Sequence, residues 1–115
     1  MTASLIGQAF RKCKAEGRPA LLTYTVVGDP TKKKSLDILK AISKNVDIIE
    51  SGMAFSTPIA DGGDIQTSAH RAIKAGINLN ETFKIIKEFK KSKYPRPVIL
   101  MGYWNLILQF NENKF

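Results

Sequence analysis

A chain of 115 residues with 43% apolar and 24% charged side chains can bury one hydrophobic core and is too short for two domains of ordinary size. Its 18 Lys and Arg against 10 Asp and Glu give a net charge of +8, which would suit a nucleic-acid or anionic membrane surface. The lysines, however, fall on the expected outer faces of helices, without interleaved aromatic residues or an arginine cluster. A solvated surface is therefore favoured over a nucleic-acid site.

The cysteine and hydropathy patterns narrow the class of protein further. The single cysteine, Cys13, excludes an internal disulfide framework and is typical of the reducing cytoplasm. No apolar run approaches the roughly 18 residues that span a bilayer, and the N-terminus lacks the apolar core of a signal peptide. Cys13 and the single histidine, His70, have no metal-ligand spacing. We therefore expect a cytoplasmic protein with no membrane partner and no metal site.

Apolar periodicity alternates along the chain between helical and strand patterns. Helices are indicated where apolar residues recur every three or four positions, and strands where short runs are rich in β-branched and aromatic residues. In chain order we expect a helix over 4–17, a strand over 19–27, a helix over 31–45 capped by Thr31, a strand over 46–50, a helix from 64 or 65 to 76, a helix over 78–93 with Asn80 in its capping pattern, a strand over 96–104, and an apolar tail.

Strands that alternate with helices predict an α/β fold with parallel strands, because each return to the sheet requires a crossover connection. Two architectures fit this order, a doubly wound sheet and a (β/α) barrel. In both, the chemistry belongs at the carboxyl ends of the strands, and Glu50 is expected at such an end. No GxGxxG follows the first strand and no GxxxxGK[ST] occurs in the chain, which argues against dinucleotide and nucleoside triphosphate sites.

Two carboxylates, Glu50 and Asp61, stand where the second strand meets its following loop. With Ile49 before it and the apolar Met53 and Phe55 after it, Glu50 is expected to be partly desolvated, which suits a general acid or base. Asp61 is flanked by small residues whose backbone can approach a ligand closely, which suits an ionised hydrogen-bond acceptor. The alternative is a solvated strand end for Glu50 and a loop or helix-cap role for Asp61. Their spacing alone does not separate these two interpretations.

The remaining polar candidates are better explained by structure than by chemistry. Asp29 precedes a proline in a GDP turn, where aspartate is favoured for its hydrogen bonds to nearby backbone. His70 falls inside a helical pattern, as a partly exposed helix residue would. Tyr24 and Tyr103 fall near strand ends, and each either lines a pocket or is a half-buried core residue.

Three segments resemble consecutive motifs of the tryptophan synthase alpha chain family, in the same order and with the expected separations: LLTYTVVGDP, DIIESGMAFSTPIADGGDIQTSAHRAIKAG and PVILMGYWN. The central segment is the most specific, with a strand-end glutamate, a glycine two residues later, FS, a P-x-ADG turn and IQ opening a helix. The resemblance implies a TIM (β/α)8 barrel. This chain would hold its N-terminal part, an extra N-terminal helix and about three βα units in one partial domain, 1–115.

The resemblance also implies a lyase of tryptophan biosynthesis. It would cleave indole-3-glycerol phosphate by a retro-aldol reaction to indole and glyceraldehyde 3-phosphate, without a cofactor. Pyridoxal phosphate would belong to the tryptophan synthase beta subunit, which receives the indole in an alpha2-beta2 heterotetramer. By resemblance, Glu50 is the acid/base and Asp61 accepts the hydrogen bond of the indole nitrogen. The positions that match substrate-contacting residues of the family are Tyr24, Ile65, Met101 and Tyr103.

The chain departs from the family pattern GIPFSDPLADGP in the loop that contacts the beta subunit in the family. Ala54 and Gly63 replace prolines and Thr57 replaces an aspartate, and Ser51 follows the glutamate, while both acids remain. A complete barrel needs about 250 residues, and the phosphate-binding glycines and serine of the family lie on later strands. We therefore expect an incomplete barrel, active only when the missing part is supplied. The alternatives are a non-catalytic fragment or docking module, and a small basic nucleic-acid-binding domain.

Overall fold

The computed structural model describes residues 4–115 and confirms the expected alternation of helices and strands. Both strand pairs are parallel, in the sheet order β1-β2-β3, so the predicted α/β class is also confirmed. The elements are α1 (Leu5–Ala15), β1 (Leu22–Val26), α2 (Lys32–Ile42), β2 (Ile48–Gly52), α3 (Gly63–Lys74), α4 (Leu79–Lys90), β3 (Val98–Met101) and α5 (Trp104–Phe110).

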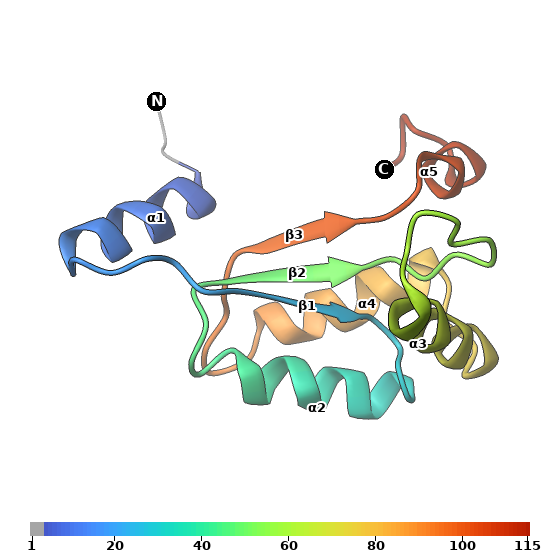
Figure 1. Ribbon diagram of the computed structural model, residues 1–115, viewed down its shortest axis with the longest axis horizontal. Coiled ribbons are helices and arrows are strands. Elements are labelled where there is room, and N and C mark those ends of the chain that lie inside the picture. The colour runs from blue at the N-terminus through green and yellow to red at the C-terminus, as the bar shows by residue number, and fades with distance from the viewer. Residues whose placement is uncertain (1–3) are drawn as a thin grey trace.

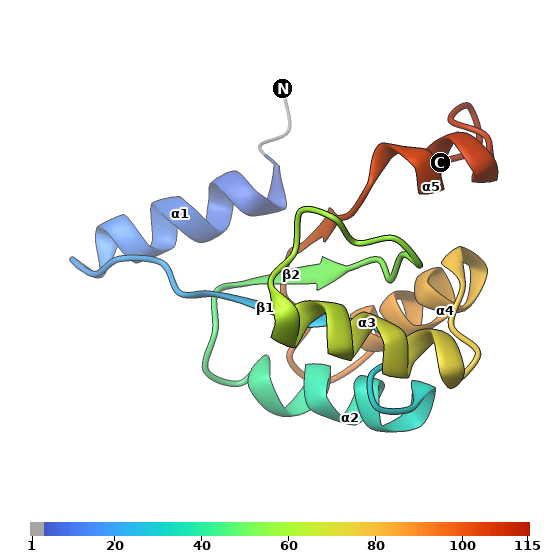
Figure 2. The ribbon, with the colours of Figure 1, turned by 45° about the vertical axis from the view of Figure 1, so that its right-hand side comes forward.

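The helices cover the sheet on one face only. Helices α2, α3 and α4 lie under the strands, whereas α1 lies beyond their amino ends and α5 beyond their carboxyl ends (Figures 1 and 2). Within residues 4–115, no helix runs along the opposite face. A section of a (β/α) barrel has this arrangement, because the uncovered face would be the barrel interior.

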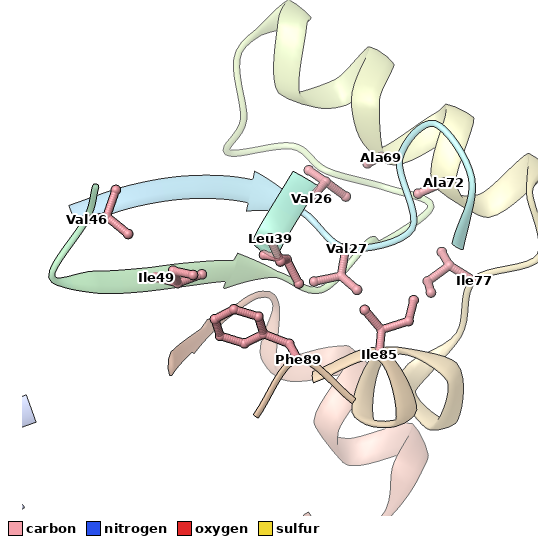
Figure 3. Close-up of a cluster of buried hydrophobic side chains, with 10 residues drawn as sticks. All are labelled: Val26, Val27, Leu39, Val46, Ile49, Ala69, Ala72, Ile77, Ile85 and Phe89. Atoms are coloured by element: carbon pink, nitrogen blue, oxygen red, sulfur yellow. The ribbon is translucent and has the colours of Figure 1, made fainter. Parts of the chain in front are cut away.

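The hydrophobic core fills the space between the sheet and the helices (Figure 3). Ile49 of β2, Leu39 of α2 and Phe89 of α4 are each 0% exposed and meet there. Burying an aliphatic or aromatic side chain of this size contributes roughly 1.5–3 kcal/mol. The core therefore holds β2 between the two crossover helices that flank it.

Side-chain caps fix the beginnings of α1, α2 and α4. Thr31 is in the extended conformation and its Oγ1 accepts a hydrogen bond from the Lys34 N–H at 3.1 Å, as predicted for α2. The predicted cap at Asn80 is wrong. Asn78 caps α4, since it is the extended residue and its Oδ1 accepts from the Glu81 N–H at 2.9 Å, whereas Asn80 lies inside the first helical turn. The sequence NLN offers two asparagines, and backbone conformation decides between them.

The predicted end of the second strand is also wrong, because β2 continues to Gly52 and Glu50 is its middle residue. Strand β2 extends beyond its apolar residues because its backbone hydrogen bonds to both neighbouring strands continue. The Val27 N–H donates to the Gly52 carbonyl at 3.0 Å, and the Met53 N–H donates to the Met101 carbonyl at 2.8 Å. Glu50 pairs in register with Tyr24 of β1 and Ile99 of β3.

The segment expected as an apolar tail begins within the short helix α5. Its apolar residues face partners distant in sequence: the Phe83 ring of α4 lies 5.5 Å from the Phe110 ring and 5.8 Å from the Phe115 ring. Half-buried Phe83 therefore packs against the C-terminal segment and not into the core. Beyond the first turn of α4, the buried apolar residues are Ile85 and Phe89.

Asp47 ties the amino ends of the strands together. Its carboxylate accepts hydrogen bonds from Arg18 Nη1 and Nη2, both at 2.9 Å, and from the Leu21 N–H at 2.8 Å. The connection from α1 to β1 is thus joined to the residue before β2. The hydrogen bonds from Arg18, helped by that from Leu21, hold the pKa of Asp47 well below its ordinary value.

Gly52 leaves room for the Tyr24 side chain. A Cβ atom built on Gly52 would collide with Oη and Cζ of Tyr24 and would lie 3.1 Å from its Cε2. The phenol ring of Tyr24 therefore extends over the Gly52 backbone, toward the carboxyl ends of the strands.

Replacing Asp47→Asn should lower the free energy of unfolding by about 1–3 kcal/mol at pH 7, because hydrogen bonds to an ionised group are lost. The folded-state pKa is depressed, so this stability is present above the ordinary value of 3.8 and is lost as the pH falls below it. Urea unfolding at pH 7 and pH 3 should show the difference from wild type shrinking in acid. Asp37→Asn, an exposed position on α2, is the control, and an equal deficit at both pH values would contradict the assignment.

Replacing Gly52→Ala should destabilise the chain by about 1–3 kcal/mol through overpacking against Tyr24. Near-ultraviolet circular dichroism should change with it, since the tyrosine must move. Gly63→Ala is the matched control, because a Cβ there meets nothing within 4 Å. Equal stability of the two variants would show that Tyr24 does not need the space above Gly52.

Candidate active site

A hollow of about 370 Å³ opens at the carboxyl ends of the three strands. Each strand or its following segment supplies part of the wall, because parallel strands end at the same edge of a sheet. The lining residues are Tyr24 from β1, Met53, Ala60 and Asp61 from the connection between β2 and α3, and Met101, Gly102, Tyr103 and Trp104 from the end of β3 and the start of α5.

Asp61 is held in this hollow by Tyr103. The Tyr103 hydroxyl donates to Asp61 Oδ2 at 3.0 Å and accepts from the Ala60 N–H at 2.9 Å. Its ring is stacked on Phe55, with 5.1 Å between the ring centres. Desolvation raises the pKa of Tyr103; the Ala60 N–H opposes that rise and the Asp61 carboxylate adds to it.

Tyr24 lies within electrostatic reach of both predicted acids. Burial raises the pKa of its phenol, and the charges of Asp61, Tyr103 and Glu50 add to the rise in that order. An uncharged phenol is therefore favoured at this position over the whole neutral range. Such a group can donate a hydrogen bond to a ligand oxygen or to a carboxylate.

Glu50 is half-buried and lies on the uncovered face of the sheet. Successive side chains of a strand point to opposite faces, and Ile49 belongs to the core on the helix side. Glu50 therefore points away from the helices, on the face that Tyr24 shares by register. Glu50 is not among the residues that line the hollow around Asp61, whereas its register partner Tyr24 is. The structure therefore does not bring the two acids together as two walls of one cavity.

Of the other predicted site residues, some line the hollow and one does not. Met101 and Tyr103 line the hollow, and Met101 is 55% exposed. Ile65 does not line it, because in the first turn of α3 it packs against the hydrophobic core. Trp104 was missed, although it belongs to the same MGYWN segment as Met101 and Tyr103 and is 58% exposed.

Asp29 has a structural role, but through side chains of α3 and not through the nearby backbone as expected. Its carboxylate accepts from Arg71 Nε at 2.7 Å and Nη2 at 2.9 Å, and from the Ser68 hydroxyl. The hydrogen bond from Arg71 is the main cause of a lowered pKa at Asp29. The connection after β1 is thus joined to α3, the helix that follows Asp61. His70, one residue before Arg71, is exposed.

A larger hollow, of about 620 Å³, is lined by other residues than the one around Asp61. It is bounded by residues 54–57, by the connection between α3 and α4, and by α5, and it includes Thr57 but no predicted site residue.

Within residues 4–115, no group of three or more His, Cys, Asp or Glu side chains is placed to hold a metal ion. None of the helices in residues 4–115 has the length and apolar character that crossing a membrane requires.

Solved structures share this arrangement of helices and strands. Subunit alpha of tryptophan synthase from Legionella pneumophila str. Paris superimposes with a TM-score of 0.88 at 32% identity, covering 98% of this chain and 44% of that one. Tryptophan synthase from M. tuberculosis, in an aminoacrylate-bound form, gives a TM-score of 0.90 at 29% identity, covering 98% of this chain and 46% of that one.

Sequence comparison agrees. The tryptophan synthase alpha chain of Pelagibacter ubique (strain HTCC1062) is 62% identical over 112 residues, which are 97% of this chain and 42% of that protein. This chain thus spans less than half the length of the relatives it matches. The model of the tryptophan synthase alpha chain family matches residues 10–115. The chain therefore belongs to the tryptophan synthase alpha chain family, and its fold is part of the TIM barrel of that family.

Proposed function

We propose that this chain carries the acid/base part of a lyase site that cleaves indole-3-glycerol phosphate to indole and glyceraldehyde 3-phosphate. One observation carries the proposal: Tyr24 is the register partner of Glu50 and lines, with Asp61, a hollow at the carboxyl ends of the strands. Family membership supplies the reaction class. In TIM barrels, the catalytic groups lie at this edge of the sheet.

The reaction needs two proton movements and one charge acceptor. Cleavage of the bond between the indole ring and the side chain requires a proton at the ring carbon and the loss of a proton from the side-chain hydroxyl. Glu50 is assigned to this proton transfer, because it is a half-buried carboxylic acid on the open face. Positive charge develops on the indole N–H in the same step, and the Asp61 carboxylate is assigned to accept its hydrogen bond.

The remaining contacts orient the substrate. Tyr24, Met101 and Tyr103 would border the indole ring, while Ile65 would act through its packing behind the site. None of these steps calls for a cofactor on this chain. The chain spans 42% of its Pelagibacter ubique relative, so the phosphate-binding part of the site is expected from the rest of the barrel.

The proposed partner is a tryptophan synthase beta subunit, in an alpha2-beta2 heterotetramer, where pyridoxal phosphate would belong to that subunit. The M. tuberculosis structures of tryptophan synthase support such a partner. Thr57 is exposed beside the hollow of about 620 Å³, and Gly63 opens α3, so both departures from the family pattern lie where they could alter docking without moving Glu50 or Asp61. We place the reaction in the cytoplasm, in keeping with an unpaired cysteine.

Indole release from indole-3-glycerol phosphate tests the proposal when this chain is combined with the remaining part of the Pelagibacter ubique alpha chain. Turnover is expected only in the combined sample. No release in that sample would leave the non-catalytic fragment or docking module as the better description. Salt-sensitive binding of DNA would instead favour the nucleic-acid alternative.

In the combined sample, Glu50→Gln should lower turnover by about 100-fold or more, the usual contribution of a general acid or base. The amide keeps the size of the side chain but cannot transfer the proton, so circular dichroism should be unchanged. Glu88→Gln, at an exposed ion pair on α4, is the control. Retained turnover in Glu50→Gln would place the proton transfer on another residue.

A further inference from the structure

Tyr103 contacts the connection between β2 and α3 in two separate ways. Its ring stacks on Phe55 near the beginning of that connection, at 5.1 Å between ring centres. Its hydroxyl bonds Ala60 and Asp61 near the end. One side chain at the start of α5 therefore spans the loop that carries Asp61.

The hydrogen-bonding capacity of the Tyr103 hydroxyl is almost fully used by these contacts. A phenol has one O–H donor and two acceptor lone pairs. The donor is used on Asp61 Oδ2 and one lone pair on the Ala60 N–H. While this pair is formed, Tyr103 cannot donate a hydrogen bond to a substrate, so its polar group serves the aspartate.

The same arrangement leaves Asp61 with one oxygen available. Within residues 4–115, Oδ2 accepts from Tyr103, and no hydrogen bond to Oδ1 is present. Both Asp61 and the exposed ring of Trp104 line the hollow. A flat heteroaromatic ring with an N–H group can thus meet a carboxylate oxygen at its edge and apolar walls at its faces.

We propose that Tyr103 is a positioning residue, which fixes the Asp61 carboxylate so that its free oxygen accepts the N–H of a planar aromatic ligand. The inference rests on the proposed function and deepens it, since it assigns to the Tyr103 hydroxyl an action through Asp61 in place of a hydrogen bond to the substrate. Inside the protein, a charge-assisted hydrogen bond of this kind gives geometric control as well as stability.

A purely structural role for Tyr103 is the competing explanation. Loss of the hydroxyl would then loosen the loop and weaken every ligand of the hollow alike. A positioning role predicts a loss confined to ligands that donate a hydrogen bond. Indole and benzofuran separate the two explanations, because they share size and shape and differ in the N–H group.

The experiment titrates the 115-residue chain with indole and with benzofuran, followed by the ring N–H signal of Trp104, the single tryptophan, in ¹H–¹⁵N NMR. Wild type should bind indole more tightly than benzofuran. Tyr103→Phe should weaken indole binding about 5- to 10-fold, the effect of about one hydrogen bond, and leave benzofuran unchanged. Asp61→Asn should reduce the preference for indole at least as much. Tyr94→Phe, an exposed tyrosine outside the hollow, should change neither.

The results distinguish failure of the positioning role of Tyr103 from failure of the role of Asp61. If Asp61→Asn removes the preference for indole but Tyr103→Phe does not, or if Tyr103→Phe weakens both ligands equally, the positioning role is overturned and the role of Asp61 survives. If wild type binds indole no better than benzofuran, or does not bind it, the inference and the assigned role of Asp61 fail together.

A second measurement covers the case in which Tyr103→Phe does not fold. The ¹³Cζ signal of Tyr103 is titrated with pH in wild type and in Asp61→Asn. Removing the carboxylate that accepts from the phenol should lower the pKa of Tyr103, because that carboxylate contributes to its rise. An unchanged pKa would show that the two groups are not coupled, and would overturn the inference.

Discussion

The parallel register of β1, β2 and β3 places the candidate site, because it brings Tyr24, Glu50 and Ile99 into one row and ends all three strands at one edge. Gly52 gives the Tyr24 side chain of that row the space it occupies. Its missing side chain leaves the volume into which Tyr24 extends, and Tyr24 is the group that both acids influence. Backbone pairing thus sets which residues are neighbours, and one absent Cβ sets how far they can approach each other.

Two ion pairs, each between a partly buried aspartate and an exposed arginine, hold the connections that the sheet ladder does not fix. Asp47 with Arg18 joins the segment before β1 to the beginning of β2, at the amino ends of the strands. Asp29 with Arg71 joins the segment after β1 to α3, at the carboxyl ends. In each pair the planar guanidinium group of the arginine donates two hydrogen bonds to the carboxylate, which restrains the relative orientation of the two side chains as well as their distance. The pair of Asp29 and Arg71 lies close to the candidate site, since α3 begins two residues after Asp61.

Local sequence patterns predicted the order of helices and strands correctly. They failed for features that depend on contacts with residues far away in the sequence. The order of strands and helices followed from apolar periodicity. The ladder that carries β2 past Glu50 depends on Val27 and Met101, neither of which lies in that segment. Helix α5 likewise gains its contacts from Phe83. The resemblance to the family supplied Glu50 and Asp61, but the bond from Tyr103 to Asp61 joins two motifs and could not be read from either alone.

The uncovered face of the sheet leaves Glu50, the acid/base of the proposed function, open to water. Strands β1 and β3 are the two edges of the sheet, so their outer backbone groups lack strand partners within the described residues. Glu50 lies on the open face, only half-buried, where water competes for the proton that it would transfer. Pairing both edges with further strands would close the barrel, shield Glu50 and keep Tyr24 and Asp61 where they are. In the proposed function, the remaining part of the barrel would therefore be needed to shield this carboxyl group as well as to hold the phosphate of the proposed substrate.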